Sequence, residues 1–116
     1  MRQIKFRAWE KKLKEIIPVY NIDFIKEMIN TDSAWRCFHE VDLMQFTGLK
    51  DKNGVEMYVG DIVQTGWQGN KKGVVVFENS TYCVDSGNGY MYFNHPESYE
   101  VIGNIYEHIK LLEEVI

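Results

Sequence analysis

Hydrophobic and polar residues alternate along much of this chain, a pattern typical of strands that bury one face. In QIKFRAW, Ile4, Phe6 and Ala8 fall on one side of such a strand. A turn is predicted by the polar EKKLKE that follows, and a returning strand by IIPVY. Because Pro18 has no amide hydrogen, this second strand should lie at an edge or end early. The pattern therefore predicts an N-terminal β-hairpin.

The next segment has a different spacing. Ile22, Ile25 and Ile29 recur at helical intervals, and Asp23 is a suitable N-cap residue. We therefore predict one or two helical turns over residues 22–29. The polar NTDSAWRC that follows is predicted to be a loop.

From Leu43 onward, short runs of β-prone residues are separated by turns that contain glycine. These runs occupy residues 43–47, 55–59, 61–65, 74–78, 81–85, 90–94 and 100–106. VVVFE is almost continuously apolar, which predicts a strand buried on both faces. The residues predicted to be buried are Ile62, Val74, Val76 and Ile102. Many short strands favour closure, so we predict a small, mainly antiparallel β-barrel or roll between Leu43 and Tyr106.

Two turns carry clear local signals. Asn88-Gly89 lies between TYCVD and YMYFN, which predicts a two-residue hairpin turn with positive φ at both residues. In KDKNG, Asp51 and Asn53 can bond nearby backbone amides, and Gly54 tolerates a positive φ. These glycines are therefore expected to turn the chain from one strand into the next.

The C-terminal segment has a helical stripe. Its members are Ile105, Ile109, Leu112 and Ile116. Glu113 and Glu114 lie at the unfavourable end of the helix dipole, so packing must hold this short helix.

Composition narrows the class of protein. The chain has 116 residues, 45% of them hydrophobic, which is enough for a folded core. It contains no apolar run of the roughly 18 residues that a membrane helix needs, and MRQIKFRAWEKK does not resemble a secretory signal. We therefore expect a cytoplasmic location.

Cys37 and Cys83 are far apart, which favours free thiols over a disulfide framework or a zinc site.

Charge is distributed unevenly. The net charge is −4, yet residues 1–15 carry six basic and two acidic residues, a local charge of +4. Such a segment can bind an acidic partner. The alternative, which we favour, is that these lysines keep an exposed hairpin edge from aggregating.

Candidate sites for chemistry fail on spacing. Gly48 to Gly54 is one residue too long for a phosphate-binding loop, and Val55 follows where lysine belongs. A calcium loop fails because Ile62 stands where a bidentate glutamate is needed. Neither a serine elbow nor a histidine set at ligand spacing is present, and Cys37 beside His39 is better explained as a core thiol near a surface imidazole. We expect no catalytic, cofactor-binding or metal-binding residues.

Aromatic residues gather in the second half of the chain. Tyr90 and Tyr92 share one strand face, and Trp67 lies in a predicted loop. Small β-barrels bind peptides or single-stranded nucleic acid on such surfaces. The acidic charge of this half disfavours nucleic acid, and cross-strand packing is the simpler role.

The sequence resembles the YopX family of phage and prophage proteins. The resemblance is carried by MRQIKFRAWEKK, LMQFTGLKDKNGVEMYVGDIV, GVVVF and YEVIGNIYEHIKLL in this order, whereas residues 22–40 contribute little. It implies an SH3-like C-terminal roll, a bacterial phage or prophage origin and members of unknown function, with homo-oligomers as one form. It supplies no catalytic residues.

These observations lead to one expected organisation. Residues 1–42 should form an N-terminal hairpin and a variable segment packed on the barrel, and residues 43–116 an SH3-like β-barrel with a short C-terminal helix. The expected function is a non-catalytic protein-binding module in the cytoplasm of the bacterial host, without membrane association. A nucleic-acid module that uses the basic N-terminal strands is the alternative, and an enzyme is third. The candidate interaction surface comprises Arg7, Lys50, Lys52, Trp67, Tyr90 and Tyr92.

Overall fold

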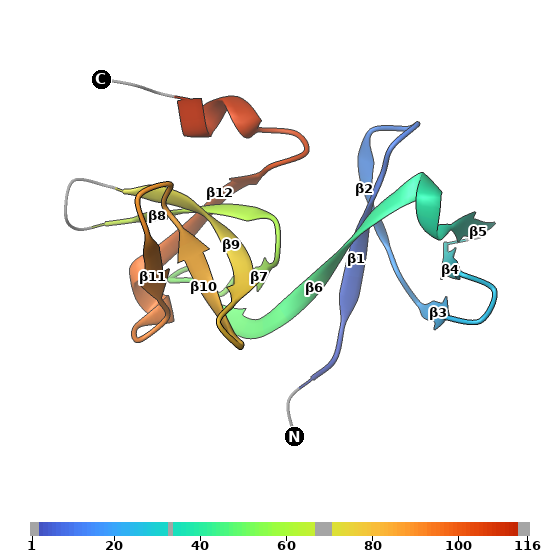
Figure 1. The fold of residues 1–116 in the computed structure, drawn as a ribbon, viewed down its shortest axis with the longest axis horizontal. Coiled ribbons are helices and arrows are strands. Elements are labelled where there is room, and N and C mark those ends of the chain that lie inside the picture. The colour runs from blue at the N-terminus through green and yellow to red at the C-terminus, as the bar shows by residue number, and fades with distance from the viewer. Residues whose placement is uncertain (1–2, 33, 67–70, 114–116) are drawn as a thin grey trace. The chain divides into compact units, whose positions relative to one another are not determined.

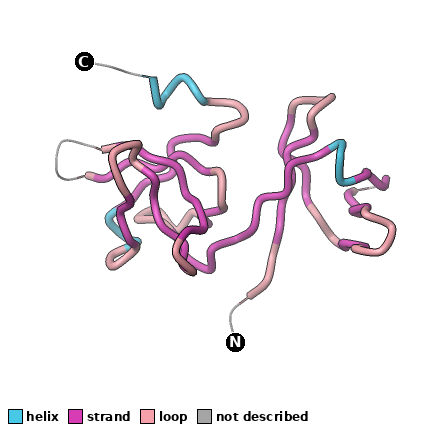
Figure 2. Tube along the Cα trace, viewed as in Figure 1, coloured by secondary structure: helices cyan, strands magenta, loops and turns pink. Residues whose placement is uncertain are grey.

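The chain is mainly β in its structure, a computed structural model that describes residues 3–32, 34–66 and 71–113. Figure 2 shows strands and loops along most of the trace, with three short helical pieces. All three are 3-10 helices, and the described residues contain no α-helix. The predicted mainly β class is therefore confirmed.

The strands are β1 (Phe6–Glu10), β2 (Glu15–Pro18), β3 (Asn21–Asp23), β4 (Met28–Thr31), β5 (Ala34–Cys37), β6 (Val41–Lys50), β7 (Glu56–Tyr58), β8 (Asp61–Thr65), β9 (Lys72–Glu78), β10 (Thr81–Asp85), β11 (Tyr90–Tyr92) and β12 (Tyr99–Asn104). The 3-10 helices are η1 (Phe38–Glu40), η2 (Pro96–Ser98) and η3 (Ile109–Glu113). The chain forms two compact units, Met1–Phe46 and Thr47–Ile116, and the boundary falls within β6.

In the N-terminal unit, the predicted β1–β2 hairpin is confirmed. β1 lies between β2 and the first part of β6, and both pairings are antiparallel. Arg7 opposite Pro18 is the last pair between β1 and β2, as expected from the missing amide hydrogen of proline. A core forms from Ala8, Ile17 and Ile29 together with Val41.

The predicted helix over residues 22–29 is wrong. The segment forms β3 and β4 of an antiparallel sheet with the order β3-β4-β5, and the end of β4 together with β5 replaces most of the predicted loop. Ile22 lies directly opposite Ile29, whereas Ile25 is almost fully exposed in the connecting turn. The Asp23 carboxylate accepts hydrogen bonds from the amides of Ile25 and Lys26, so it closes a turn instead of capping a helix.

The C-terminal unit is built on a five-stranded antiparallel sheet with the order β11-β10-β9-β8-β12. Figure 1 shows these strands curling into a half-barrel. Its core contains Met57, Val63, Val75, Val84 and Tyr99. A β-bulge between Val101 and Gly103 interrupts the pairing of β12 with β8, which adds local twist to the sheet.

The expected burial of the VVV run needs correction. Val75 is fully buried against the core, but Val74 and Val76 on the opposite face are only half-buried. The strand is therefore not buried on both faces. Ile62 is buried as predicted, whereas Ile102 is only half-buried.

The predicted β10–β11 hairpin is confirmed, but its turn is displaced by one residue. Asp85 pairs with Tyr90, and the amide of Ser86 donates to the carbonyl of Gly89, so Gly87-Asn88 is the centre of the turn. Gly87 has a φ of 87°, whereas Asn88 is not among the described residues with positive φ. Glycine with positive φ at the first central position is the arrangement of a type II′ turn.

The predicted amphipathic C-terminal helix is also corrected. The described part is the 3-10 helix Ile109–Glu113, and the amide of Leu111 donates to the carbonyl of His108 three residues earlier. The His108 ring lies against Gly103 so closely that a β-carbon at Gly103 would meet its Nδ1 at 2.7 Å. This contact and the bond from the Asn104 amide to His108 Nδ1 position the segment. Ile116 lies outside the described residues.

Candidate interaction surfaces

The loop that joins β6 to β7 is organised by Asp51, which is buried at 5% exposure. One carboxylate oxygen accepts hydrogen bonds from the amides of Asn53 and Val55 at 2.8 and 2.9 Å. The other accepts the amide of Val101 at 2.9 Å, which ties the loop to β12. These amides are occupied by an internal carboxylate, so they are not available to cradle a phosphate. The Lys52 amide donates to the Tyr99 carbonyl at 3.0 Å.

Three glycines of this stretch have a positive φ: Gly54 and Gly60 lie between strands, whereas Gly48 lies within β6, which continues past it to Lys50. Gly48, Gly54 and Gly60 have φ values of 86°, 80° and 100°. L-residues rarely adopt such values. The amide of Gly60 donates to the Val75 carbonyl, and Gly60 precedes Asp61, which starts β8. The expected structural role of these glycines fits this geometry.

Lys50, the last residue of β6, and Lys52 of this loop are both exposed. The ammonium group of Lys52 lies 3.7 Å from the Glu100 carboxylate, which also accepts a hydrogen bond from the side-chain amide of Asn53. The positive charge of Lys52 is therefore partly neutralised by Glu100 of β12, and the two lysines form part of a surface with both positive and negative side chains.

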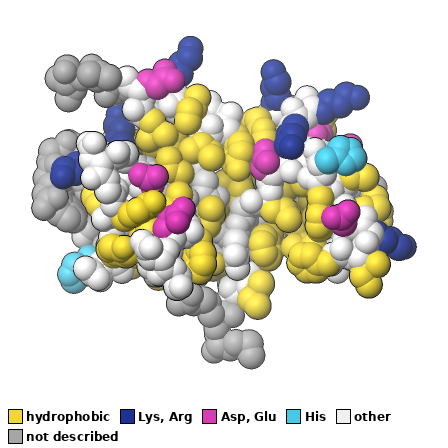
Figure 3. Space-filling model, viewed as in Figure 1, with side chains coloured by type: hydrophobic (Ala, Val, Ile, Leu, Met, Phe, Trp, Pro, Cys, Tyr) yellow, Lys and Arg dark blue, Asp and Glu magenta, His cyan; other side chains and the backbone are white. Residues whose placement is uncertain are grey.

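Three lysines of the N-terminal unit lie in the turn of the β1–β2 hairpin, and its other basic residues lie elsewhere. Lys11 lies 4.0 Å from the Asp42 carboxylate, and Lys12 and Lys14 are exposed in the same turn. Lys5 lies over the ring of Phe46, 5.3 Å from its centroid, a cation–π contact. In Figure 3 the dark blue side chains of this unit gather mainly over the turn of the β1–β2 hairpin. Arg7, near the other end of β1, is half-buried.

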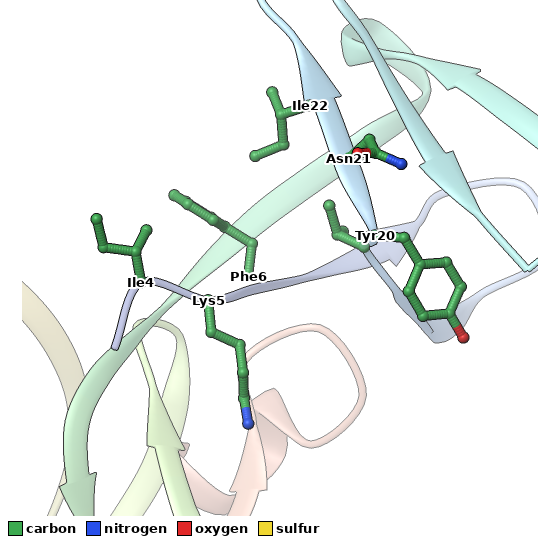
Figure 4. Close-up of a pocket in the computed structure, with 7 residues that line it drawn as sticks. Ile4, Lys5, Phe6, Tyr20, Asn21 and Ile22 are labelled. Carbon is green, nitrogen blue, oxygen red and sulfur yellow. The ribbon is translucent and has the colours of Figure 1, made fainter. Parts of the chain in front are cut away.

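An open hollow with a mixed polar and apolar lining lies at the open end of the same hairpin. Its lining residues come from two segments that diverge after the last β1–β2 pair, namely Ile4, Lys5, Phe6, Val19, Tyr20, Asn21 and Ile22. In Figure 4 the side chains of Ile4, Phe6 and Ile22 face a common space, whereas those of Lys5 and Tyr20 extend away from it. The Tyr20 hydroxyl donates to the Asp32 carboxylate at 2.8 Å, and this bond and the Asp32 charge raise the pKa of Tyr20.

The size of the hollow limits its ligand. Its volume is about 120 Å³, below the roughly 300–1,000 Å³ of small-molecule sites. The hollow therefore has room for about one side chain of a partner. Ile4, at its edge, is 78% exposed.

The expected aromatic surface is present on β11 of the C-terminal unit. Tyr90 and Tyr92 point to the same side of the strand and are 43% and 47% exposed. Trp67, the third aromatic residue predicted for this surface, lies outside the described residues. The structure thus brings together the two tyrosines, whereas Arg7 belongs to the other unit and Lys50 and Lys52 to the Asp51 loop.

Sequence reasoning missed the hollow. Alternation placed Ile4 and Phe6 on one face, and Pro18 indicated an early end to the second strand. Those two signals together mark an open hairpin end. The positions of Val19 and Ile22 depend on the β3–β4 hairpin, which had been predicted as helix.

The described residues hold no group of three or more His, Cys, Asp or Glu side chains suited to a metal ion. Within the same residues, no helix is long and apolar enough to cross a membrane. The Cys37 and Cys83 thiols are free, and burial raises the pKa of Cys83, which favours its neutral form.

These features define a mainly β protein with a curled antiparallel sheet, an open surface hollow and an exposed pair of tyrosines. The sequence pattern of the YopX protein family matches residues 5–113, and the chain therefore belongs to the YopX family. The fold is similar to the crystal structure of protein EF1440 from Enterococcus faecalis, with a TM-score of 0.73 and 23% identity over 97% of this chain and 99% of that one. At this identity the match shows a shared fold. No curated protein matches the sequence.

Proposed function

We propose that this chain is a non-catalytic protein-binding module of a phage or prophage, acting in the bacterial cytoplasm, with an SH3-like barrel as its C-terminal unit. The observation that carries the proposal is the open hollow at the end of the β1–β2 hairpin, where the apolar side chains of Ile4, Phe6 and Ile22 stand beside polar lining groups. It is sized for one side chain, and Ile4 beside it is 78% exposed. Apolar residues left exposed beside a pocket are typical of protein interaction sites.

The alternative is nucleic-acid binding through the basic turn of the same hairpin. Its supporting observation is the exposure of Lys12 and Lys14. Against it, Lys11 lies near Asp42 and the whole chain has a net charge of −4. Phosphate contacts supply most non-specific affinity for nucleic acid, so an acidic protein is a poor candidate.

The two functions are separated by two variants of one hairpin. Tagged wild type, Ile4→Asp and Leu13→Asp are expressed in the bacterial host, and co-purified proteins are quantified with and without nuclease. Leu13 is the matched control because it is also an exposed apolar residue, at 55%, but lies in the basic turn. We expect Ile4→Asp to lose the partner and Leu13→Asp to keep it, with no effect of nuclease. Loss on nuclease treatment, or retention by both variants, would contradict the proposal.

A further inference from the structure

Strand register defines a second surface, on the C-terminal unit. Tyr90 lies opposite Asp85, and Tyr92 lies opposite Cys83. Residues directly opposite each other point to the same side of a sheet. Cys83 in turn lies opposite Val76 of β9. The core residues Val75 and Val84 belong to the other side, so the two tyrosines lie on the opposite face of β9, β10 and β11. On this face Cys83 is fully buried and Val76 half-buried, whereas Tyr90 and Tyr92 are exposed.

This face also carries negative charge. Glu78 lies two residues beyond Val76 along β9 and opposite Thr81, and Asp85 lies opposite Tyr90. The charge of Glu78, followed by burial and the charge of Asp85, raises the pKa of Tyr90. Neither carboxylate forms an ion pair within the described part of the chain.

The one lysine with the same orientation on β9 is remote from Glu78. Lys72 begins β9, whereas Glu78 ends it, and Lys72 lies opposite Gln64 of β8. The negative potential near the tyrosines is thus not offset by a neighbouring cation on β9, β10 or β11.

The geometry of β11 favours an extended partner. β11 is an edge strand of the five-stranded sheet. An added peptide strand can pair with such an edge, and every second side chain then reaches the same face. The Tyr92 hydroxyl accepts a long hydrogen bond, 3.4 Å, from the side-chain amide of Asn79.

We propose that the face of β9–β11 that carries the two tyrosines is a docking surface for an extended, cationic protein segment with lysine or arginine at alternate positions. The cations would lie over the Tyr90 and Tyr92 rings and beside the carboxylates of Glu78 and Asp85, and the exposed edge of β11 would pair with the segment backbone. The same charges repel nucleic acid. This inference goes beyond the proposed function because it concerns a different unit and does not require the hollow to be occupied.

The probe is a pair of capped peptides of equal length, one alternating lysine with valine and the other alternating glutamate with valine. Both favour extended structure, so they differ in charge alone. Each is titrated into the full chain while backbone amide chemical shifts are recorded. We expect the lysine peptide to bind, with chemical-shift changes centred on Tyr90–Tyr92. Its affinity should fall as salt is added, and the glutamate peptide should not bind.

Two double variants with the same change in net charge locate the interaction. Glu78→Lys with Asp85→Asn alters the proposed surface, and the asparagine can still accept the Gly87 amide that Asp85 accepts now. Glu97→Lys with Glu113→Gln changes exposed residues of η2 and η3. The first pair should weaken lysine-peptide binding by about tenfold, and the second by less than about twofold.

Several results would overturn the inference. They are absence of lysine-peptide binding at about 1 mM, equal binding of both peptides, shifts centred outside β9–β11, or equal losses in the two double variants. Concentration-dependent shifts in this face without peptide would assign it to self-association instead. Failure of the Ile4→Asp capture experiment would leave this test unaffected, so the two proposals fail separately.

Discussion

Replacement of Asp51 by alanine removes three hydrogen-bond acceptor contacts at once. The amides of Asn53 and Val55 lose partners within the loop, and the amide of Val101 loses the bond that ties β12 to the loop. A hydrogen bond to a charged group contributes about 1.5–3 kcal/mol to stability. Water can replace the local partners in part, so we expect a loss of about 3 kcal/mol in the free energy of unfolding.

Asp23→Ala is the matched control. Asp23 also accepts two backbone amides, from Ile25 and Lys26, but these bonds are exposed, and among the described residues Asp23 has no third bond to a distant strand. We expect a cost of about 1 kcal/mol, similar to the loss of a capping residue. The difference between the two variants measures the burial of Asp51 and its bond to Val101.

Urea unfolding followed by circular dichroism gives both free energies, and amide hydrogen exchange shows where protection is lost. Asp51→Ala should increase exchange at Val101, whereas Asp23→Ala should not. Asp51→Asn should also destabilise, because its one carbonyl oxygen cannot accept from both sides of the loop. The reasoning is refuted if Asp51→Ala costs no more than Asp23→Ala, or if Asp51→Asn is as stable as the wild type.

Three further changes test the C-terminal unit by the same unfolding assay. Gly73→Ala should lower the free energy of unfolding by about 2 kcal/mol, because the new β-carbon would meet Val84 Cγ1 at 2.5 Å. Gly66→Ala is the control, because a β-carbon there has open space and should leave stability nearly unchanged. Equal losses in the two variants would contradict this reasoning. Gly89→Val should cost about 1–3 kcal/mol of stability. Gly89 has a φ of 140°, which valine rarely adopts, and an added β-carbon would meet no neighbour, so the cost would come from the backbone alone. An unchanged stability would contradict this. Burial raises the pKa of Tyr99 above its ordinary value of 10.0. The stability gained by burying the neutral hydroxyl is therefore fully present below the unfolded-state pKa and is lost as pH rises through the folded-state pKa. Tyr99→Phe should reduce the alkaline loss of stability, and identical pH profiles would refute that assignment.

The β-hairpins could be predicted where alternation and turn residues agree. Alternation in QIKFRAW predicted β1, and the glycine-rich SGNG predicted the β10–β11 hairpin. The position of the turn within SGNG could not be predicted, because Gly87 and Gly89 can both adopt positive φ and the strand register decides between them. Local signals therefore identified the hairpin but not its register.

The helix predicted over residues 22–29 shows how a spacing can mislead. Ile22 and Ile29 are seven residues apart, which places them on one helical face, but they also lie opposite each other across the β3–β4 hairpin. The exposed Ile25 belongs to the turn. Periodicity alone cannot separate these two solutions, because the deciding contact, Ile29 with the Ala8 core, is long-range.

The candidate surfaces were predicted in part. Tyr90 and Tyr92 could be assigned to one face from their spacing, but the carboxylate of Glu78 reaches them only through the pairing of β9 with β10 and β11. The hollow depends on where two segments diverge, which is a tertiary property. Pro18 gave the position of that divergence and no information on the residues that line it.

Photo-crosslinking from position 4 tests the proposed protein-binding function most directly. A photoreactive phenylalanine derivative replaces Ile4, or Leu13 as the control at the other end of the hairpin, and bacterial cells that express the protein are irradiated. The account predicts a crosslinked protein adduct from position 4 that persists after nuclease treatment and is absent from position 13. Absence of a protein adduct from position 4, or the same adducts from both positions, would contradict binding through the hollow.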